Sequence, residues 1–296
     1  MLGGRRVKTT KSFQVLSFCL LLSLSIICLL PFLIIISGSL TKEEYIIKYG
    51  YSLIPGKLSF DAYKAVFYYP ERIFKAYAVT GFVTLAGTSA GLFIIAMTGY
   101  VLQRKDLRYR NQLSFFIYFT TLFSGGLIPW YIVITRFLHL KDSIWVLVLP
   151  CLMSPFLIIL MKNFISSVPI SIVESAKMDG AGDFKIFTAL ILPLIKPALA
   201  TVGLFLALQF WNDWYMSSIF IETPSKYSLQ YYLYTVLNSS EFLKSAAASH
   251  VPSDFNIPGE SVKLATAVVA TGPVILFYPF VQKYFVQGIT IGAVKG

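Results

Sequence analysis

Charged residues are scarce in this chain of 296 residues, since Asp, Glu, Lys and Arg make up 13% and hydrophobic residues make up 56%. Such a composition lies outside the usual range of soluble domains and indicates one membrane domain of several helices. The formal net charge is +11. In a membrane protein an excess of Lys and Arg is typical of the cytoplasmic segments, so we expect no nucleic-acid partner.

The sequence also lacks the common signatures of catalytic and metal-binding sites. Its two histidines, His139 and His250, lie far apart, and no His-Glu-x-x-His occurs. Cys19, Cys28 and Cys151 lie in apolar runs without ligand spacing, which argues against a disulfide framework or a zinc site. No Gly-x-x-x-x-Gly-Lys-Ser/Thr phosphate loop is present. We therefore expect no catalytic residue and no metal site in this chain.

Long apolar runs predict six membrane-spanning helices, because a bilayer requires about 20 apolar residues per helix. The first run begins at Phe13 and is some 25 residues long. A signal peptide has a shorter apolar core, so we expect this run to be kept as a span. The result is an all-α membrane protein with a six-span domain at 13–283. Its predicted parts are a segment at 1–12, spans at about 13–38, 76–102, 113–135, 143–162, 194–219 and 264–282, a polar loop at 163–193 and a tail at 284–296.

Charge counting predicts that both termini are cytoplasmic. With that orientation the inside segments hold 14 basic and 4 acidic residues, and the outside segments hold 11 basic and 10 acidic residues. The short inside segments near span ends are densely basic, and these carry the most weight in the positive-inside rule. The 163–193 loop is then cytoplasmic as well.

Ionisable residues are rare within the predicted spans. Asp213 comes closest, but it follows Leu194 by 19 residues, or about 28 Å of helix, near the outer surface. Transporters driven by protons or ions need such groups inside the membrane. The sequence therefore disfavours a secondary transporter and indicates an energy source outside this chain.

The loop at 163–193 predicts two short helices joined by a sharp turn. Pro169 suits a helix start, Asp179-Gly180 suits a helix end with glycine in the left-handed conformation, and Asp183 is expected to cap the second helix. Such a loop fits a cleft of another protein, and the alternative is a helix packed on lipid headgroups. The expected apolar face of the first helix is Ile172, Val173, Ala176 and Met178, and Phe184, Phe187 and Ile191 lead from the second helix to Pro193.

The same loop resembles the Glu-Ala-Ala…Gly…Ile-x-Leu-Pro loop of permeases from binding-protein-dependent ABC importers. Ser175 replaces the usual Ala and Leu190 the usual Ile. The resemblance implies docking onto an ATPase subunit, with Glu174 in an ion-pairing or capping role, Gly180 at the turn and Ala176 allowing close approach. The implied docking residues are Glu174, Ser175, Ala176, Asp179, Gly180, Ala181, Leu190, Leu192 and Pro193.

Further stretches are similar to the smaller membrane subunit of carbohydrate importers of the maltose type. These are 211–214 and the 288–296 tail, while 123–129 and 51–55 resemble the branch for complex oligosaccharides and polysaccharide fragments. The resemblance implies a multi-pass permease in the bacterial cytoplasmic membrane with a cytoplasmic coupling helix. It also implies a homologous second permease subunit, two ATPase subunits that bind ATP and Mg, and an extracytoplasmic solute-binding protein. No cofactor is expected in this chain itself.

The implied substrate is a complex carbohydrate, including uronate-containing glycans such as alginate. Alternatives are another solute such as glycerol phosphate or, from another class, a secondary transporter. Sugars stack on aromatic rings and hydrogen-bond to amides and carboxylates, but Trp and Tyr also gather at membrane interfaces as anchors. The candidate pathway residues are Trp130, Tyr131, Trp211, Asn212, Asp213, Trp214 and Tyr215.

Overall fold

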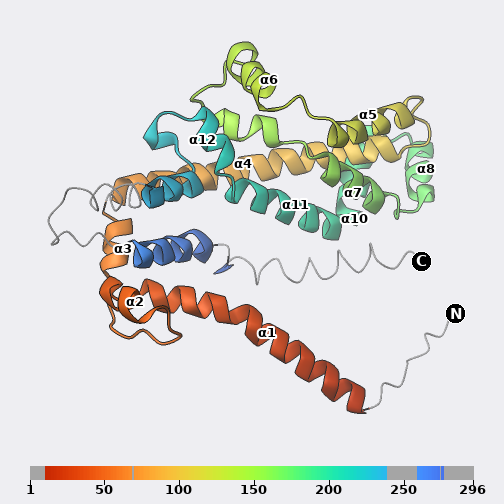
Figure 1. Ribbon diagram of the computed structural model, residues 1–296. Coiled ribbons are helices and arrows are strands. Elements are labelled where there is room, and N and C mark those ends of the chain that lie inside the picture. The colour runs from red at the N-terminus through yellow and green to blue at the C-terminus, as the bar shows by residue number, and fades with distance from the viewer. Residues whose placement is uncertain (1–10, 69, 239–258, 274, 277–296) are drawn as a thin grey trace. The chain divides into compact units, whose positions relative to one another are not determined.

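The computed structural model describes residues 11–68, 70–238, 259–273 and 275–276 (Figure 1). Every regular element in these ranges is a helix, apart from one bridge between Thr41 and Leu58. The chain divides into two compact units. Unit 1 comprises Met1–Tyr68 and Val236–Gly272, and unit 2 comprises Tyr69–Thr235 and Pro273–Gly296.

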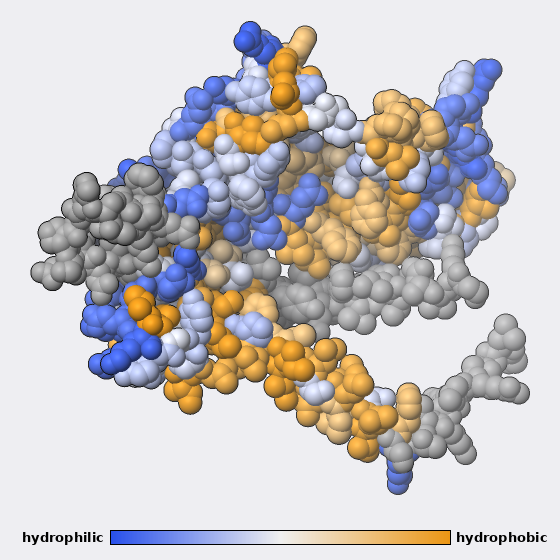
Figure 2. Space-filling view, in the orientation of Figure 1, coloured by the Kyte–Doolittle hydropathy of each residue, from blue (hydrophilic) through white to orange (hydrophobic). Residues whose placement is uncertain are grey.

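Unit 1 is built on α1 (Lys11–Ser39), followed by α2 (Glu43–Tyr49), α3 (Asp61–Val66) and a helix over 260–273. The segment Phe13–Ser39 has a mean hydropathy of 3.0, and apolar side chains cover the length of α1 in Figure 2. A helix that is apolar all round suits a membrane span. Pro31 lies inside α1 without ending it.

A buried carboxylate, Glu43, joins α2 to the start of the helix over 260–273. Its oxygens accept hydrogen bonds from the backbone N–H groups of Gly259 (3.0 Å), Glu260 (2.9 Å) and Ser261 (2.8 Å), and from the Ser261 hydroxyl (2.7 Å). Burial alone raises the pKa of Glu43, but the bonds from Glu260, Ser261 and Gly259 outweigh it and lower the pKa to about 2. A carboxylate on the first N–H groups of a helix satisfies donors that have no partner within the helix.

Unit 2 is organised around α4 (Pro70–Gln103), an unbroken helix of 34 residues. It packs against α7 (Pro155–Ile165) and α11 (Lys196–Trp211) (Figure 1). Gly99 permits this close packing on α7, because a Cβ atom there would lie 3.0 Å from the backbone nitrogen of Lys162. Ile95 and Ala96 on α4 are fully buried in the core that results.

Three other apolar segments of unit 2 are bent. Two of the bends lie within the predicted spans 113–135 and 143–162, and the third lies at the start of the predicted span 194–219. Arg110–Leu122 and Leu127–Phe137 meet at 114°, Ile144–Cys151 and Pro155–Ile165 at 48°, and Asp183–Leu194 and Lys196–Trp211 at 86°. Glycine or proline lies at each bend, where it interrupts the helical hydrogen bonds. The elements involved are α5 (Arg110–Leu122), α6 (Leu127–Ile132), η1 (Val133–Phe137), η2 (Ile144–Leu147), η3 (Leu149–Cys151), α9 (Asp183–Ile186), η4 (Phe187–Ile191) and α10 (Leu192–Leu194).

By length and apolar composition, two helices of the described ranges could cross a membrane, Phe13–Ser39 and Pro70–Gln103, and up to five could if each bent pair is one span. The predicted span at 194–219 is interrupted again after α11, because α12 (Tyr215–Phe220) begins a new helix. The predicted sixth span, 264–282, lies partly outside the described residues, as do the tail and most of segment 1–12.

Candidate functional site

The predicted loop helix is α8 (Ile170–Met178), and a closed turn ends it. Asp179 is its C-terminal boundary, and Gly180 follows with φ +78°. The N–H of Gly180 donates to the carbonyl of Lys177 and the N–H of Ala181 donates to that of Ala176, both at 3.0 Å. This pair of bonds is the Schellman motif, which satisfies carbonyls that would otherwise lack partners. The helix end predicted at Asp179-Gly180 is thus confirmed.

One side of α8 faces the protein and the other is exposed. Ala176 is buried, and Val173 packs against the core from a partly buried position. Glu174 and Ser175 are exposed. The prediction that Met178 lies on the apolar face is wrong, because its side chain is 82% exposed. In Figure 2, polar side chains gather at the end of unit 2 where α8 lies.

The second helix of the loop differs from its prediction at Asp183. Gly182 is the N-terminal boundary of α9, and no side chain caps it, so the predicted capping role of Asp183 is wrong. The carboxylate of Asp183 instead forms an ion pair with Arg104. Phe187 and Ile191 are buried as the sequence suggests, and Phe184 is 65% exposed. Among the implied docking residues, Leu190 and Leu192 pack partly buried against the core, and Pro193 is exposed.

Four charged side chains join α8, α9 and the segment after α4. Arg104 pairs with Asp106 and, through Nη1, with Asp183 Oδ1 at 2.7 Å. The Nζ of Lys177 lies 3.1 Å from Asp106 and 3.9 Å from Asp183. Hydrogen bonds from Arg104 and then Lys177 hold the pKa of Asp106 well below its usual range. These contacts could not be predicted from the sequence. The short charged segment after α4 is visible there, but the sequence does not show which distant charges it meets.

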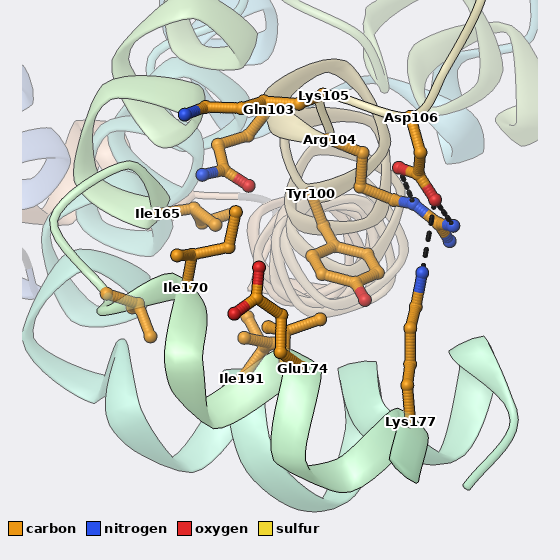
Figure 3. A pocket seen from close by; sticks show the side chains of 12 residues that line it. Tyr100, Gln103, Arg104, Lys105, Asp106, Ile165, Ile170, Glu174, Lys177 and Ile191 are labelled. Atoms are coloured by element: carbon orange, nitrogen blue, oxygen red, sulfur yellow. Dashed lines mark hydrogen bonds and ion pairs between the residues drawn. The ribbon is translucent and has the colours of Figure 1, made fainter. Parts of the chain in front are cut away.

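A cavity of about 370 Å³ lies between α8 and the end of α4. Figure 3 shows the carboxylate of Glu174 directed into it, near Tyr100 and Gln103. Within the described part of the chain, Glu174 has no hydrogen-bond or ion-pair partner through its side chain. No group of three or more His, Cys, Asp or Glu side chains in those ranges could hold a metal ion.

Two of the candidate pathway residues lie together in a second cavity. Trp130 on α6 and Tyr215 on α12 line an open groove of about 500 Å³. The groove forms at the bend between α5 and α6, where Gly126 has φ +85°. The other lining residues are Ser124, Gly125, Gly126, Leu127, Pro129 and Val133.

The other five candidate pathway residues do not line this groove. Tyr131 stacks on Phe220, with ring centroids 5.6 Å apart. Asp213 Oδ1 accepts a hydrogen bond from the N–H of Met216 at 3.3 Å, which supports the first turn of α12. The rest lie around the break between α11 and α12: Trp211 ends α11, Asn212 bounds it, and Trp214 packs against Tyr215 and Tyr234.

Comparisons with known proteins agree with the resemblance of the loop. Residues 4–291 match the family described as binding-protein-dependent transport system inner membrane component. The chain is 39% identical to a polygalacturonan/rhamnogalacturonan transport system permease protein of Bacillus subtilis, over 96% of this chain and 98% of the relative. It is 28% identical to a maltodextrin transport system permease protein of Streptococcus pneumoniae, over 96% of each chain.

A solved structure is similar in fold. It is the crystal structure of a bacterial ABC transporter involved in the import of the acidic polysaccharide alginate, with a TM-score of 0.76 and 31% identity over 94% of this chain and 99% of that one. The loop with its glycine turn, the helical architecture and these matches lead to one conclusion. The chain belongs to the family of inner membrane components of binding-protein-dependent transport systems.

Proposed function

We propose that this chain is the permease subunit of an ATP-driven importer and forms half of a translocation pathway for a complex carbohydrate. A homologous second permease forms the other half, an extracytoplasmic solute-binding protein delivers the sugar, and two separate ATPase subunits bind ATP and Mg. The observation that carries this proposal is α8, an exposed helix closed by a glycine turn and tied by ion pairs to the end of α4.

The proposed subunit crosses the cytoplasmic membrane six times, with both termini and α8 on the cytoplasmic side. The distribution of Lys and Arg supports this orientation. The bent segments of unit 2 are compatible with it, because broken helices are tolerated at membrane depth where they pack against protein or line a cavity.

In this proposal α8 is the coupling helix that docks into a cleft of the ATPase subunit. Glu174 lines the open cavity beside α8, where its carboxylate offers a charge to a group of the partner, and the Gly180 turn fixes where the helix ends. Closure of the ATPases on ATP moves α8 and shifts the permease between inward-facing and outward-facing states. The change is a rigid-body movement driven by the different affinity of the partner for the two states.

For the substrate we propose an oligosaccharide or polysaccharide fragment that contains uronate residues. Two of the similar proteins are named for acidic polysaccharides, polygalacturonan/rhamnogalacturonan and alginate. The groove with Trp130 and Tyr215 offers two aromatic rings from different helices at a Gly-rich break, the kind of interrupted helix that marks binding sites in transporters.

The test is ATP hydrolysis by the complete importer reconstituted in liposomes. Binding protein loaded with oligogalacturonate or oligoalginate should stimulate hydrolysis, and neutral glycans should stimulate less. Stimulation by no carbohydrate at all would refute the proposed substrate class. In parallel, Glu174→Lys should abolish stimulated hydrolysis or detach the ATPase, whereas the same charge change at the exposed Glu71 should have little effect.

A further inference from the structure

The ion pairs between α8, α9 and the end of α4 form a closed set in which each cation contacts both anions. Arg104 uses its fork to reach Asp106 and Asp183, and Lys177 lies 3.1 Å and 3.9 Å from the same two carboxylates. Figure 3 shows Arg104, which directly follows α4, and Lys177 on α8 converging on Asp106. Removal of one member leaves two like charges close together, so the set acts as a unit.

The cluster lies at the C-terminal end of α4, and α4 runs through unit 2 without a break. α4 has 34 residues with no proline in its interior, whereas the three neighbouring apolar segments are bent by 48° to 114°. In the N-terminal third of α4, the Thr80 hydroxyl accepts a hydrogen bond of 2.7 Å from the N–H of Leu229, which follows α12 in the chain. From Thr80 to Gln103 the helix extends about 34 Å, at the usual rise per residue.

We propose that Arg104, Asp106, Lys177 and Asp183 form a clamp that makes α8 and α4 move as one body, so that α4 carries the movement of the coupling helix to the opposite end of unit 2. The four are positioning residues, since they act through α8 and bind neither ATP nor sugar. The inference rests on the proposed function, because it requires that an ATPase moves α8.

Charged contacts suit this task because they fix direction as well as distance. The planar guanidinium of Arg104 holds two carboxylates from different segments in a defined geometry, which an apolar contact would not do. Arg104 is also the least exposed member, at 21%, so its pairs are the least screened by water.

The first test is a double-mutant cycle in the reconstituted importer. Arg104→Ala and Asp183→Ala should each retain the bound ATPase subunits and basal hydrolysis, but lower sugar transport per ATP by about tenfold. The double variant should be no worse than either single variant, because both remove the same contact. Lys105→Ala is the matched control, since it removes a neighbouring charge that joins no ion pair in the described part of the chain.

Three outcomes overturn the clamp: normal coupling in the single variants, additive losses in the double variant, or loss of the ATPase subunits. The unaltered importer serves as the reference for the proposed function. If it shows no carbohydrate-stimulated hydrolysis, the proposed function fails rather than the clamp.

A second test restores the connection covalently. Arg104→Cys with Asp183→Cys, with serine at Cys19, Cys28 and Cys151, should be poorly coupled until a short bifunctional maleimide joins the two positions, and should then regain transport. Inhibition or no recovery in cross-linked material would mean that the two segments must separate during the cycle, which overturns the clamp.

Discussion

The described part of unit 2 contains two glycine turns that share a positive φ and differ in their surroundings. Gly180 has φ +78° and Gly126 has φ +85°, and at both positions a Cβ atom would meet nothing within 4 Å. In both cases, therefore, the backbone conformation rather than lack of space opposes a larger side chain.

The two turns differ in how the backbone N–H and C=O groups next to the glycine are hydrogen-bonded. At Gly180 two hydrogen bonds of 3.0 Å close the end of α8, and the ion pairs of Lys177 and Asp183 fix the corner to α4. At Gly126 the N–H donates to the Ser124 hydroxyl at 3.2 Å, and the helices on either side diverge by 114° around an open groove. A locally closed turn gives a rigid corner that can transmit movement, whereas an open break leaves room for a ligand.

The largest effect is expected for Gly180→Val, which would show whether the closed turn transmits movement. A branched side chain in the left-handed region costs about 1–2 kcal/mol, so α8 should end differently and transport per ATP should fall by roughly tenfold. The matched control is Gly182→Val, because Gly182 has φ −70° and open space around it. Equal coupling in the two variants, measured as transport against hydrolysis, would contradict the role of the turn.

A smaller and different effect is expected for Gly126→Val. Gly126 has φ +85° and ψ 174°, a region that is open almost only to glycine, so valine there should distort the groove and slow sugar transport several-fold, while the ATPase subunits stay bound and basal hydrolysis is unchanged. Gly81→Val is the control, since Gly81 on α4 lies outside the groove, has no positive φ and has no atom within 4 Å of its Cβ position. Loss of the ATPase subunits from the Gly126 variant would remove the functional distinction between the two turns.

Trp130→Ala should lower sugar transport by roughly twofold to tenfold, because an aromatic stacking contact contributes about 0.5–1.5 kcal/mol. Trp130→Phe should retain most of the transport. Trp145→Ala is the control, because Trp145 is also half exposed but packs on Phe82 at 5.9 Å, away from the groove. Initial uptake rates with saturated binding protein measure the effect, and equal rates for Trp130→Ala and Trp145→Ala would exclude a sugar contact at Trp130.

The smallest effect on transport is expected for Glu43→Gln in unit 1, which separates stability from coupling. The pKa of Glu43 is about 2, below its ordinary value of 4.5, so its stabilisation is present above about pH 4.5 and is lost as the pH falls toward 2. The variant should be up to about 3 kcal/mol less stable at neutral pH, with the difference shrinking in acid. Thermal unfolding in detergent measures this, with the exposed Glu44→Gln as control. Parallel pH profiles for Glu43→Gln and the unaltered chain would contradict the assignment.

The parts of the loop that the sequence predicts correctly depend on neighbouring residues. Asp179-Gly180 ends a helix because the left-handed residue and its two hydrogen bonds lie within one turn. The predicted capping role of Asp183 fails because the N–H groups at a helix start are only one of the partners that stabilise a carboxylate. The guanidinium of Arg104 is a stronger partner. Likewise, the apolar spacing placed Met178 on the buried face, but the helix ends there and its last side chain lies beyond the core.

The candidate pathway residues also show that the sequence indicates residue chemistry, whereas the fold decides which residues meet. Seven aromatic and polar residues fit the chemistry of sugar binding, but helix packing brings only Trp130 and Tyr215 to one groove. Stacking of Tyr131 on Phe220 and the hydrogen bond of Asp213 to Met216 use those side chains within the protein.

By itself the sequence determined that this chain is an all-helical membrane protein of the binding-protein-dependent transporter family, with a helix, a glycine turn and a second helix between two apolar segments. Apolar composition, backbone preference and motif spacing are local properties, and they can be read without the fold. Only the tertiary structure decided where three of the apolar segments bend and which charges meet. Lys177 and Asp106 lie 71 positions apart, and it is the packing of α4 against α7 and α11 that brings the end of α4 to the loop that holds α8.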